Sequence, residues 1–298
     1  MEFEIFCENV INELHQIYDG AKIEIHKIYK NNGVCLQGLT ILEKGKAMAP
    51  NIYLDAYYQQ FMSGSVSIGQ IVYEIASQHD EIKVDMPEDI KWTWENVKEK
   101  IFCKIINKGA NKERLANAPH RDYLDLAVTV RVLHQMGKDG ISSTEVDYKT
   151  LQLLGITEED LFEQAIQNTE RLFSLERQSL LDVVARHLDE EDKLKELAMD
   201  GNEPMPMYIL TNTQGINGAT AMLYKNVLKD MADDLGVDGF YIMPSSIHES
   251  IIMCGDADVR FLKELVVEAN RSAVSRVEWL SDSVYKYDRE EDKVEIVA

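Results

Sequence analysis

Two short segments of this 298-residue chain bring together side chains that could bind a ligand or take part in catalysis. The first spans residues 211–218 (TNTQGING), between a predicted strand and a predicted helix. Glycines let backbone amides face a ligand, and the N-terminus of a helix attracts anions. The spacing matches neither a P-loop nor a dinucleotide-binding fingerprint, so a tight strand-to-helix turn is the alternative. The candidate ligand-binding residues here are Thr211, Asn212, Gly215, Asn217 and Gly218.

The second segment, residues 244–249 (PSSIHE), holds two hydroxyls, an imidazole and a carboxylate at a predicted turn. A histidine activates a serine when its ring reaches the hydroxyl and a carboxylate orients the ring. The segment therefore predicts a hydrolase-like site with His248 as the base. The alternative is a turn with local side-chain-to-backbone hydrogen bonds, since the chain has no GxSxG nucleophile elbow. The candidate nucleophiles are Ser245 and Ser246, and the candidate orienting carboxylates are Glu249 and Asp125.

A third group of polar residues precedes and begins a predicted buried strand. His120 is a further candidate ligand-binding residue, and Asp122 and Asp125 follow it closely. If these residues met His248 and Glu249, they would form an acid/base or metal site, because two histidines with carboxylates suit Zn²⁺ or Fe²⁺. No HExxH or other compact ligand motif is present, so a hydrogen-bonded loop is the alternative. The sequence assigns no metal ligand and leaves any cofactor unknown.

The charge of the chain limits its partners. Against 31 basic side chains stand 52 acidic ones, a formal net charge of −21. Such a charge repels phosphate, so we expect neither nucleic acid nor an anionic membrane surface as a partner. Residues 155–204 hold 14 acidic and five basic side chains, which predicts a solvated surface or a docking site for a basic partner. No apolar run approaches the ~18 residues of a membrane span.

The cysteines and the N-terminus indicate a cytoplasmic protein. The four cysteines are widely separated and form no CxxC pair, which argues against a structural zinc site and a disulfide framework. The first ten residues, MEFEIFCENV, are acidic and lack the basic and apolar regions of a signal peptide. We therefore expect reduced thiols and a cytoplasmic location.

Hydrophobic spacing and turn residues predict the elements that would position these side chains. In the first third we expect helices at 2–18, 53–62 and 68–76, a β-hairpin around the turn 31–33, and a connector at 80–91. Next come a helix at 92–107, a loop at 111–119, strands at 123–133 and near 145–153, and a helix from a capping box at Thr157 to Phe173. The remainder predicts a helix end and loop at 189–206, strands at 207–211, 240–243 and 247–253, helices at 224–235 and 262–269, and an edge of the sheet after 284.

Helices and strands are mixed without regular βαβ alternation, which predicts an α+β fold. We expect a mixed or antiparallel sheet packed with amphipathic helices. The connector containing Pro87 suggests two subdomains, although one domain is the alternative. Residues 1–90 would form a hairpin-plus-helices subdomain, and residues 91–298 a larger α+β domain.

Four segments resemble a known family. They are NIYLDAYYQQF, YILTNTQGINGATAML, YIMPSSIHESIIM and LSDSVYKYDR, and the resemblance spans about residues 20–290. The chain resembles an uncharacterised family of clostridial gut bacteria that is known only as a domain of unknown function. A more distant similarity is to another uncharacterised Gram-positive family, the YtpQ-like proteins. The resemblance implies a cytosolic bacterial protein and supplies no catalytic residue.

Two functional hypotheses remain. The first is a non-catalytic protein that binds an unidentified protein or small molecule, because the chain carries no recognisable catalytic or cofactor motif. The second is a small-molecule hydrolase that uses a serine, histidine and carboxylate or a metal around residues 245–249. Whether the protein is an enzyme is left open at this level.

Overall fold

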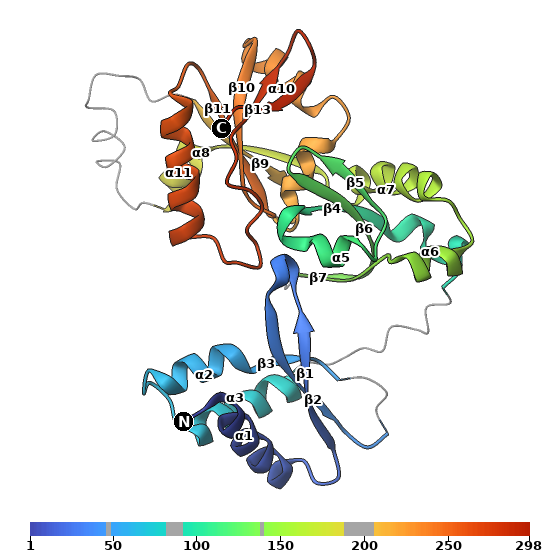
Figure 1. Ribbon diagram of the computed structural model, residues 1–298, viewed down its shortest axis with the longest axis vertical. Helices are drawn as coiled ribbons and strands as arrows, with labels where there is room; N and C mark the ends of the chain where they lie inside the picture. Colours follow the sequence, from blue (N-terminus) through green and yellow to red (C-terminus); the bar gives the residue numbers. More distant parts are fainter. Residues whose placement is uncertain (46–48, 82–91, 138–139, 188–205) are drawn as a thin grey trace. The chain divides into compact units, whose positions relative to one another are not determined.

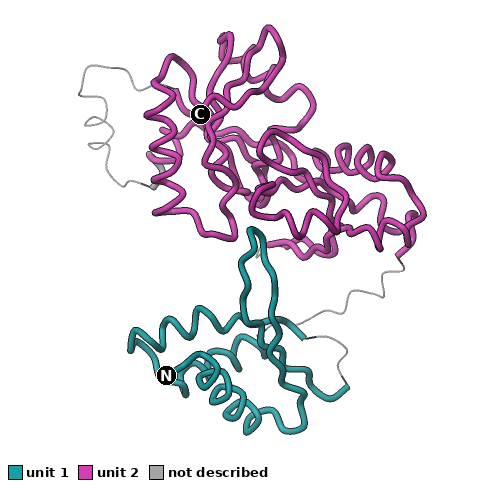
Figure 2. The backbone as a smooth tube through the Cα atoms, viewed as in Figure 1, with its two compact units in different colours: residues 1–90 teal, residues 91–298 magenta. Residues whose placement is uncertain are grey.

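A computed structural model shows an α+β protein with three antiparallel sheets, as the sequence predicts (Figure 1). It describes residues 1–45, 49–81, 92–137, 140–187 and 206–298. The chain divides into two compact units, residues 1–90 and 91–298 (Figure 2). The loop predicted at 189–206, apart from its last residue, and residues 188–204 of the acidic region lie outside the described residues.

The first unit is a small sheet covered by helices. Its core is formed where the apolar side of α1, including Phe6, Val10 and Leu14, meets Leu39 and Ile41 of the sheet. Sheet order is β1-β2-β3, with all pairs antiparallel. The elements are α1 (Phe3–Ile17), β1 (Lys22–Tyr29), the 3₁₀ turn η1 (Asn31–Gly33), β2 (Cys35–Leu42), β3 (Ile52–Tyr53), α2 (Leu54–Met62) and α3 (Ile68–Glu81).

The hairpin of this unit confirms the predicted turn. β1 and β2 pair from Lys22 with Leu42 to Tyr29 with Cys35. Between them Asn32 and Gly33 adopt positive φ angles of 59° and 69°, a region that asparagine and glycine tolerate best. The residue types at the turn therefore fix the register of the hairpin.

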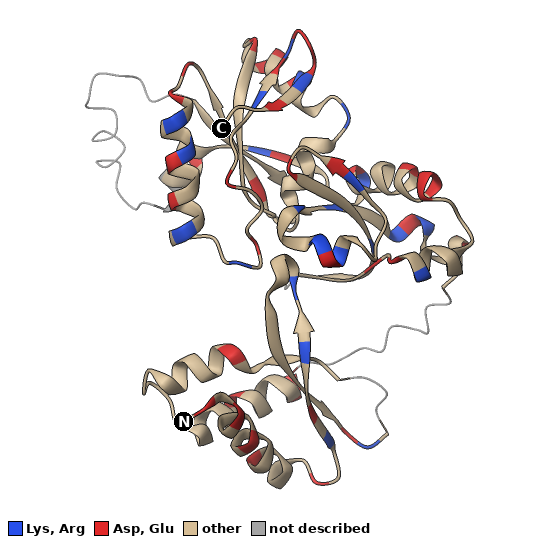
Figure 3. Ribbon diagram, in the orientation of Figure 1, with Lys and Arg blue, Asp and Glu red and all other residues tan. Residues whose placement is uncertain are grey.

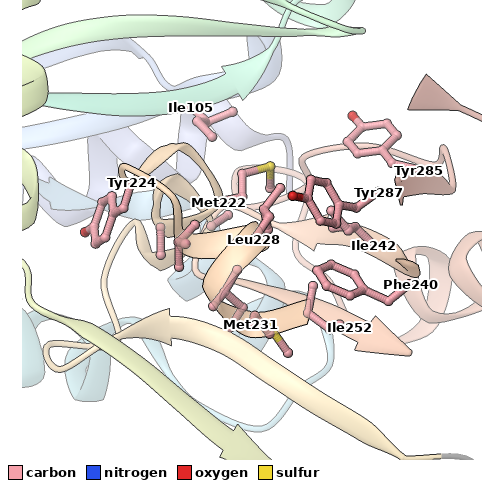
Figure 4. Close-up of a cluster of buried hydrophobic side chains, with 14 of the residues drawn as sticks. Ile105, Met222, Tyr224, Leu228, Met231, Phe240, Ile242, Ile252, Tyr285 and Tyr287 are labelled. Atoms are coloured by element: carbon pink, nitrogen blue, oxygen red, sulfur yellow. The ribbon is translucent and has the colours of Figure 1, made fainter. Parts of the chain in front are cut away.

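The second unit contains two sheets that share one core. The larger has six strands in the order β13-β12-β10-β11-β9-β8, and the smaller has β4-β6-β5 with β7 beside β6. Ile105 and Leu126 of the smaller sheet join a cluster with Phe240, Ile242 and Ile252 of the larger one (Figure 4). The strands are β4 (Ile101–Asn107), β5 (His120–Tyr123), β6 (Leu126–Gly137), β7 (Gly140–Glu145), β8 (Leu175–Ser179), β9 (Met207–Asn212), β10 (Gly239–Ser246), β11 (Glu249–Cys254), β12 (Tyr285–Asp288) and β13 (Lys293–Ile296).

Short helices lead into these sheets and longer ones cover them. α7 begins at the predicted capping box, in which Thr157 and Asp160 bond each other's backbone. α11 packs on the larger sheet through Leu262 and Val266. The helices of this unit are α4 (Trp94–Val97), η2 (Lys98–Lys100), η3 (Gly109–Asn111), α5 (Lys112–Leu115), α6 (Tyr148–Leu154), α7 (Glu158–Leu172), α8 (Leu180–His187), η4 (Gly218–Leu223), α10 (Val227–Leu235) and α11 (Val259–Ser272).

Three sequence-based elements are wrong. The helix predicted at 92–107 is a short helix, a 3₁₀ turn and then the buried strand β4, because its apolar run is buried on both faces and carries no alternation. The strand predicted near 145–153 is mostly α6, which begins after the helix cap Asp147. The turn predicted at 244–246 belongs to β10, and the chain reverses at Ile247 and His248 instead.

The outer edge of β4 is closed by side chains. The backbone N–H of Cys103 donates to Thr169 Oγ1 at 2.8 Å, and the N–H of Ile105 donates to Thr220 Oγ1 at 3.3 Å. Both threonines are buried, so each hydroxyl replaces water on a strand edge that no further strand pairs. α7 and η4 are thereby held against the smaller sheet.

Asp125 joins the smaller sheet to the segment before β12. It lies in the tight turn between β5 and β6, where Leu124 has a φ of 56°. Its carboxylate accepts hydrogen bonds from Ser281 Oγ at 2.6 Å, Ser283 Oγ at 3.1 Å and the hydroxyl of Tyr285. Burial and the adjacent carboxylate raise the pKa of Tyr285 well above its usual value, so its hydroxyl stays a donor.

Acidic residues occur in both units, and basic residues are interspersed among them along the chain (Figure 3). In the described part of the chain, no helix is both long enough and apolar enough to cross a bilayer.

We expect Asp125→Ala to lower the free energy of unfolding of the second unit by about 3 kcal/mol, because three hydroxyls lose a charged acceptor. All three tryptophans lie beyond residue 91, so tryptophan fluorescence in urea follows this unit. Asp122→Ala is the control, since it removes an exposed ion pair with Lys108 and should leave the midpoint nearly unchanged. Equal midpoints for the two variants would contradict the role given to Asp125.

A second prediction concerns the helix cap Asp147, whose Oδ1 accepts from the N–H of Thr150 at 2.7 Å. This bond lowers the carboxyl pKa below the usual 3.8. The cap therefore stabilises the fold above that pH and loses its effect as pH falls through the lowered pKa. Asp147→Ala should cost about 1 kcal/mol at neutral pH and less near pH 3, as measured by urea midpoints. Asp147→Asn, a cap that does not titrate, should show no such pH dependence, and a gap independent of pH for the alanine variant would refute the assignment.

Candidate functional site

The two segments that the sequence singles out meet in the second unit. The hydroxyl of Thr211, at the end of β9, donates to the backbone oxygen of His248 at 2.8 Å. The N–H of Ala219 in η4 donates to the backbone oxygen of Ile247 at 3.2 Å. Residues 211–218 thus lie against the β10–β11 turn, and we call this contact, together with Glu278 described below, the His248 junction.

Gly218 is required at this junction because two chain segments approach closely there. A Cβ atom on Gly218 would lie 2.0 Å from Thr211 Oγ1 and 2.3 Å from the backbone oxygen of His248. Both distances are far below van der Waals contact. The glycine therefore allows these two chain segments to pack closely.

The loop between β9 and η4 is closed by its own hydrogen bonds. The side chain of Asn212 donates to the backbone oxygen of Ile216 at 2.9 Å and accepts from the N–H of Gln214 at 3.0 Å. The N–H of Gly215 donates to the backbone oxygen of Asn212 at 2.9 Å. Gly215 and Asn217 have positive φ angles, which the tight turn requires. The backbone N–H groups of Gln214 and Gly215, which could have bound an anion, therefore bond to Asn212 within the loop.

The ring of His248 is held by a backbone oxygen and a carboxylate. Its Nδ1 lies 3.2 Å from the backbone oxygen of Gly215, a contact in which the ring must be the donor. Its Nε2 lies 3.6 Å from Oε1 of Glu278, and about a third of the side chain is exposed. Ser275 donates to the other carboxylate oxygen of Glu278 at 2.8 Å. Glu278 is the functional candidate that the sequence analysis missed, because 30 positions and an irregular segment separate it from His248.

The hydrogen bonds described for the two serines involve the backbone and not this ring. Ser246 Oγ accepts from the backbone N–H of His248 at 3.1 Å, which is the local side-chain-to-backbone bond that the sequence offered as the alternative. The backbone oxygen of Ser245 accepts from the N–H of Leu280 at 3.0 Å. Glu249 pairs with Ser246 in the strand ladder, and Glu278 occupies the position beside the imidazole. The imidazole of His248 thus lies beside a carboxylate, while the Ser246 hydroxyl is bonded to the backbone.

The third predicted group, His120, Asp122 and Asp125, bonds to residues other than His248. His120 Nδ1 lies 3.0 Å from the backbone oxygen of Ala118, and His120 pairs with Thr129 in the sheet. Asp122 accepts from Lys108 Nζ at 2.6 Å, and this bond lowers the pKa of the carboxyl. Asp125 is engaged by three hydroxyls. Among the residues that the structure describes, no group of three or more histidines, cysteines or acidic residues could hold a metal ion.

Three surface hollows lie elsewhere on the second unit. Their volumes are about 480, 350 and 380 Å³. None of the three is lined by a residue of the His248 junction or by His120. The junction therefore has no hollow of this group beside its partly exposed histidine.

Gly218→Ala should destabilise the second unit by about 3 kcal/mol, because two backbone groups and a threonine must move to admit one methyl. Tryptophan fluorescence in urea gives the midpoint. The matched control is Gly215→Ala in the same loop, where a Cβ meets nothing within 4 Å and only the positive φ costs about 1 kcal/mol. An effect at Gly218 no larger than that at Gly215 would refute the close approach.

Comparisons with known proteins bear on the family alone. No curated protein and no solved structure matches the chain. The resemblance to a family known only as a domain of unknown function is confirmed by a family model that covers residues 3–289. The chain belongs to this family of unknown function (DUF5688).

Proposed function

We propose that this protein works by binding a small molecule or a protein partner and not by catalysis. One observation carries the proposal: the groups suited to catalysis at the His248 junction are bonded to the protein itself. The ring of His248 contacts Gly215 and Glu278, and the hydroxyl of Ser246 accepts from the backbone. Activating Ser246 would require breaking the contact of His248 with Gly215 and the bond of the Ser246 hydroxyl to the backbone, each of which stabilises the fold by about 1 kcal/mol.

The surface of the second unit supports a binding function. Its three hollows, of about 350 to 480 Å³, fall in the range of small-ligand sites, which is roughly 300–1,000 Å³. The net charge of −21 disfavours nucleic acid and anionic membranes as partners. We therefore favour a small molecule, with a protein as the other class of partner.

The cellular setting forms part of the proposal. All four cysteines are free, and burial raises the pKa of the Cys7 and Cys103 thiols to about 11. Free thiols of this kind suit the reducing cytoplasm. A bacterial, clostridial source is what the family resemblance implies.

The second candidate is a hydrolase centred on His248. Its support is the 3.6 Å approach of His248 Nε2 to Glu278, together with the exposed part of the ring. In this version Glu278, and not Glu249 or Asp125, would orient the base, and Ser246 would have to turn its hydroxyl toward the imidazole.

A fluorophosphonate probe, which labels only activated serines, separates the two candidates. We expect the full chain to stay unlabelled, because the hydroxyl of Ser246 bonds to the backbone N–H of His248 and not to its ring. Native mass spectrometry of the protein purified from bacterial cytoplasm should show a non-covalently bound mass that His248→Ala retains.

Labelling is read against Ser246→Ala and Ser245→Ala. A wild-type chain that is labelled and loses the label in either variant would establish the hydrolase and overturn the binding function. Loss of the bound mass in His248→Ala, with unchanged unfolding, would place binding at the junction and contradict the internal role given to its groups.

A further inference from the structure

The largest of the three hollows lies beside α7. With a volume of about 480 Å³, it is lined by α4 on one side and by the start of α7 on the other. Side chains of α7 at intervals of three and four residues share one face of that helix. The lining residues are Trp94, Ile156, Asp160, Glu163, Gln164 and Gln167.

This face of α7 is turned away from the sheet. Leu161, Phe162 and Ala165 form the buried face of the helix. The side chain of Asn168 donates to the backbone oxygens of Lys98 and Ile101 at 2.6 and 3.0 Å. These bonds hold the segment that follows Trp94 along α7, so both walls of the hollow are fixed by the fold.

The lining is acidic and aromatic. It contains two carboxylates, two side-chain amides and an indole, and it contains no lysine or arginine. Within the part of the chain that the structure describes, Trp94 stacks on no ring or cation, and Glu163 pairs with no basic group. Bonds from Thr157 lower the pKa of Asp160, which therefore stays ionised over the neutral range.

The dipole of α7 opposes a cation at the N-terminal end of the helix, but the carboxylates there outweigh it. The N-terminus of a helix carries about half a positive charge. Glu158, Glu159, Asp160 and Glu163 lie in the first two turns, and in the described part of the chain the ion pair at this end joins Glu159 to Arg121. Figure 3 shows acidic residues gathered at this end of α7. The carboxylates therefore favour a cation here, and Trp94 supplies an indole to the lining, an aromatic ring of the kind whose face also attracts cations.

We propose that this hollow binds a small organic cation, with an ammonium group between Trp94 and the carboxylates of Asp160 and Glu163. The amide oxygens of Gln164 and Gln167 supply acceptors for its N–H groups, and Ile156 supplies apolar contact for its carbon chain. An inorganic metal ion fits the lining less well, because the indole gives it no ligand and only two carboxylates are present. The inference rests on the proposed binding function and adds a ligand class and a place.

Calorimetric titration of the full chain with the diamine cadaverine tests this site. We expect saturable binding with a Kd in the millimolar range or tighter, as one or two weak contacts provide. The neutral diol of the same length, pentanediol, should not bind, and Mg²⁺ should not displace cadaverine. Glu163→Gln and Trp94→Leu should each weaken binding about fivefold, and Trp94→Phe should weaken it less, because phenylalanine keeps an aromatic face.

The matched control is Glu158→Gln, which removes the same charge from the same helix at an exposed position outside the hollow. It should leave cadaverine binding nearly unchanged. Equal weakening by Glu158→Gln and Glu163→Gln would show diffuse attraction to an acidic surface and overturn the site, as would binding of pentanediol, full competition by Mg²⁺ or no binding at all. If cadaverine fails while the fluorophosphonate probe leaves the chain unlabelled, the site falls and the binding function stands.

Discussion

The Asp125 carboxylate accepts hydrogen bonds from three hydroxyl groups, on Ser281, Ser283 and Tyr285. These residues precede or begin β12, the second strand of the larger sheet, whereas Asp125 lies in a turn of the smaller one. Leu124, beside Asp125 in the same turn, has a φ of 56°, a conformation that costs a leucine about 1–2 kcal/mol and persists only where neighbours over-determine it. The carboxylate of Asp125 therefore joins the β5–β6 turn of the smaller sheet to the segment that leads into β12 of the larger one.

The same segment positions the carboxylate beside His248. The backbone oxygen of Glu278 accepts from the N–H of Ile247 at 2.8 Å, and the N–H of Leu280 donates to Ser245. These bonds hold residues 278–280 beside the end of β10. Because Asp125 anchors it a few residues later, the approach of Glu278 to His248 follows from the packing of the unit. The pair needs no catalytic role to explain its geometry.

Local patterns in the sequence were sufficient for much of the fold. The Asn-Asn-Gly turn and the Thr157 capping box act through residues next to each other, so propensity alone identifies them. β4 could not be identified in this way, because its outer edge is satisfied by hydroxyls of Thr169 and Thr220, each more than 60 positions away. An apolar run without alternation does not tell a buried strand from a helix.

In the candidate site, too, local contacts were predictable from the sequence and contacts between distant segments were not. The nearness of Ser246 to His248 in the sequence indicated a local bond, and a local bond is present, although it joins the hydroxyl to the backbone and not to the ring. The contact of His248 with Gly215 and the approach of Glu278 come from separate segments. No spacing rule connects such segments, so the residues of the junction were predictable by type while their partners were not.

Polar groups in this protein differ in what a ligand would have to displace. A ligand at the His248 junction must break bonds that hold β9, η4 and the β10–β11 turn together, and the free energy of those bonds reduces the affinity of the ligand. A ligand in the hollow beside α7 displaces only water from Glu163 and Trp94, because these side chains contribute to no described internal pair. Recognition is favoured where side chains are placed by the fold and left unbonded by it. By this criterion Glu163 and Trp94 are better placed to meet a ligand than Ser246 and His248, whose polar groups are engaged within the fold.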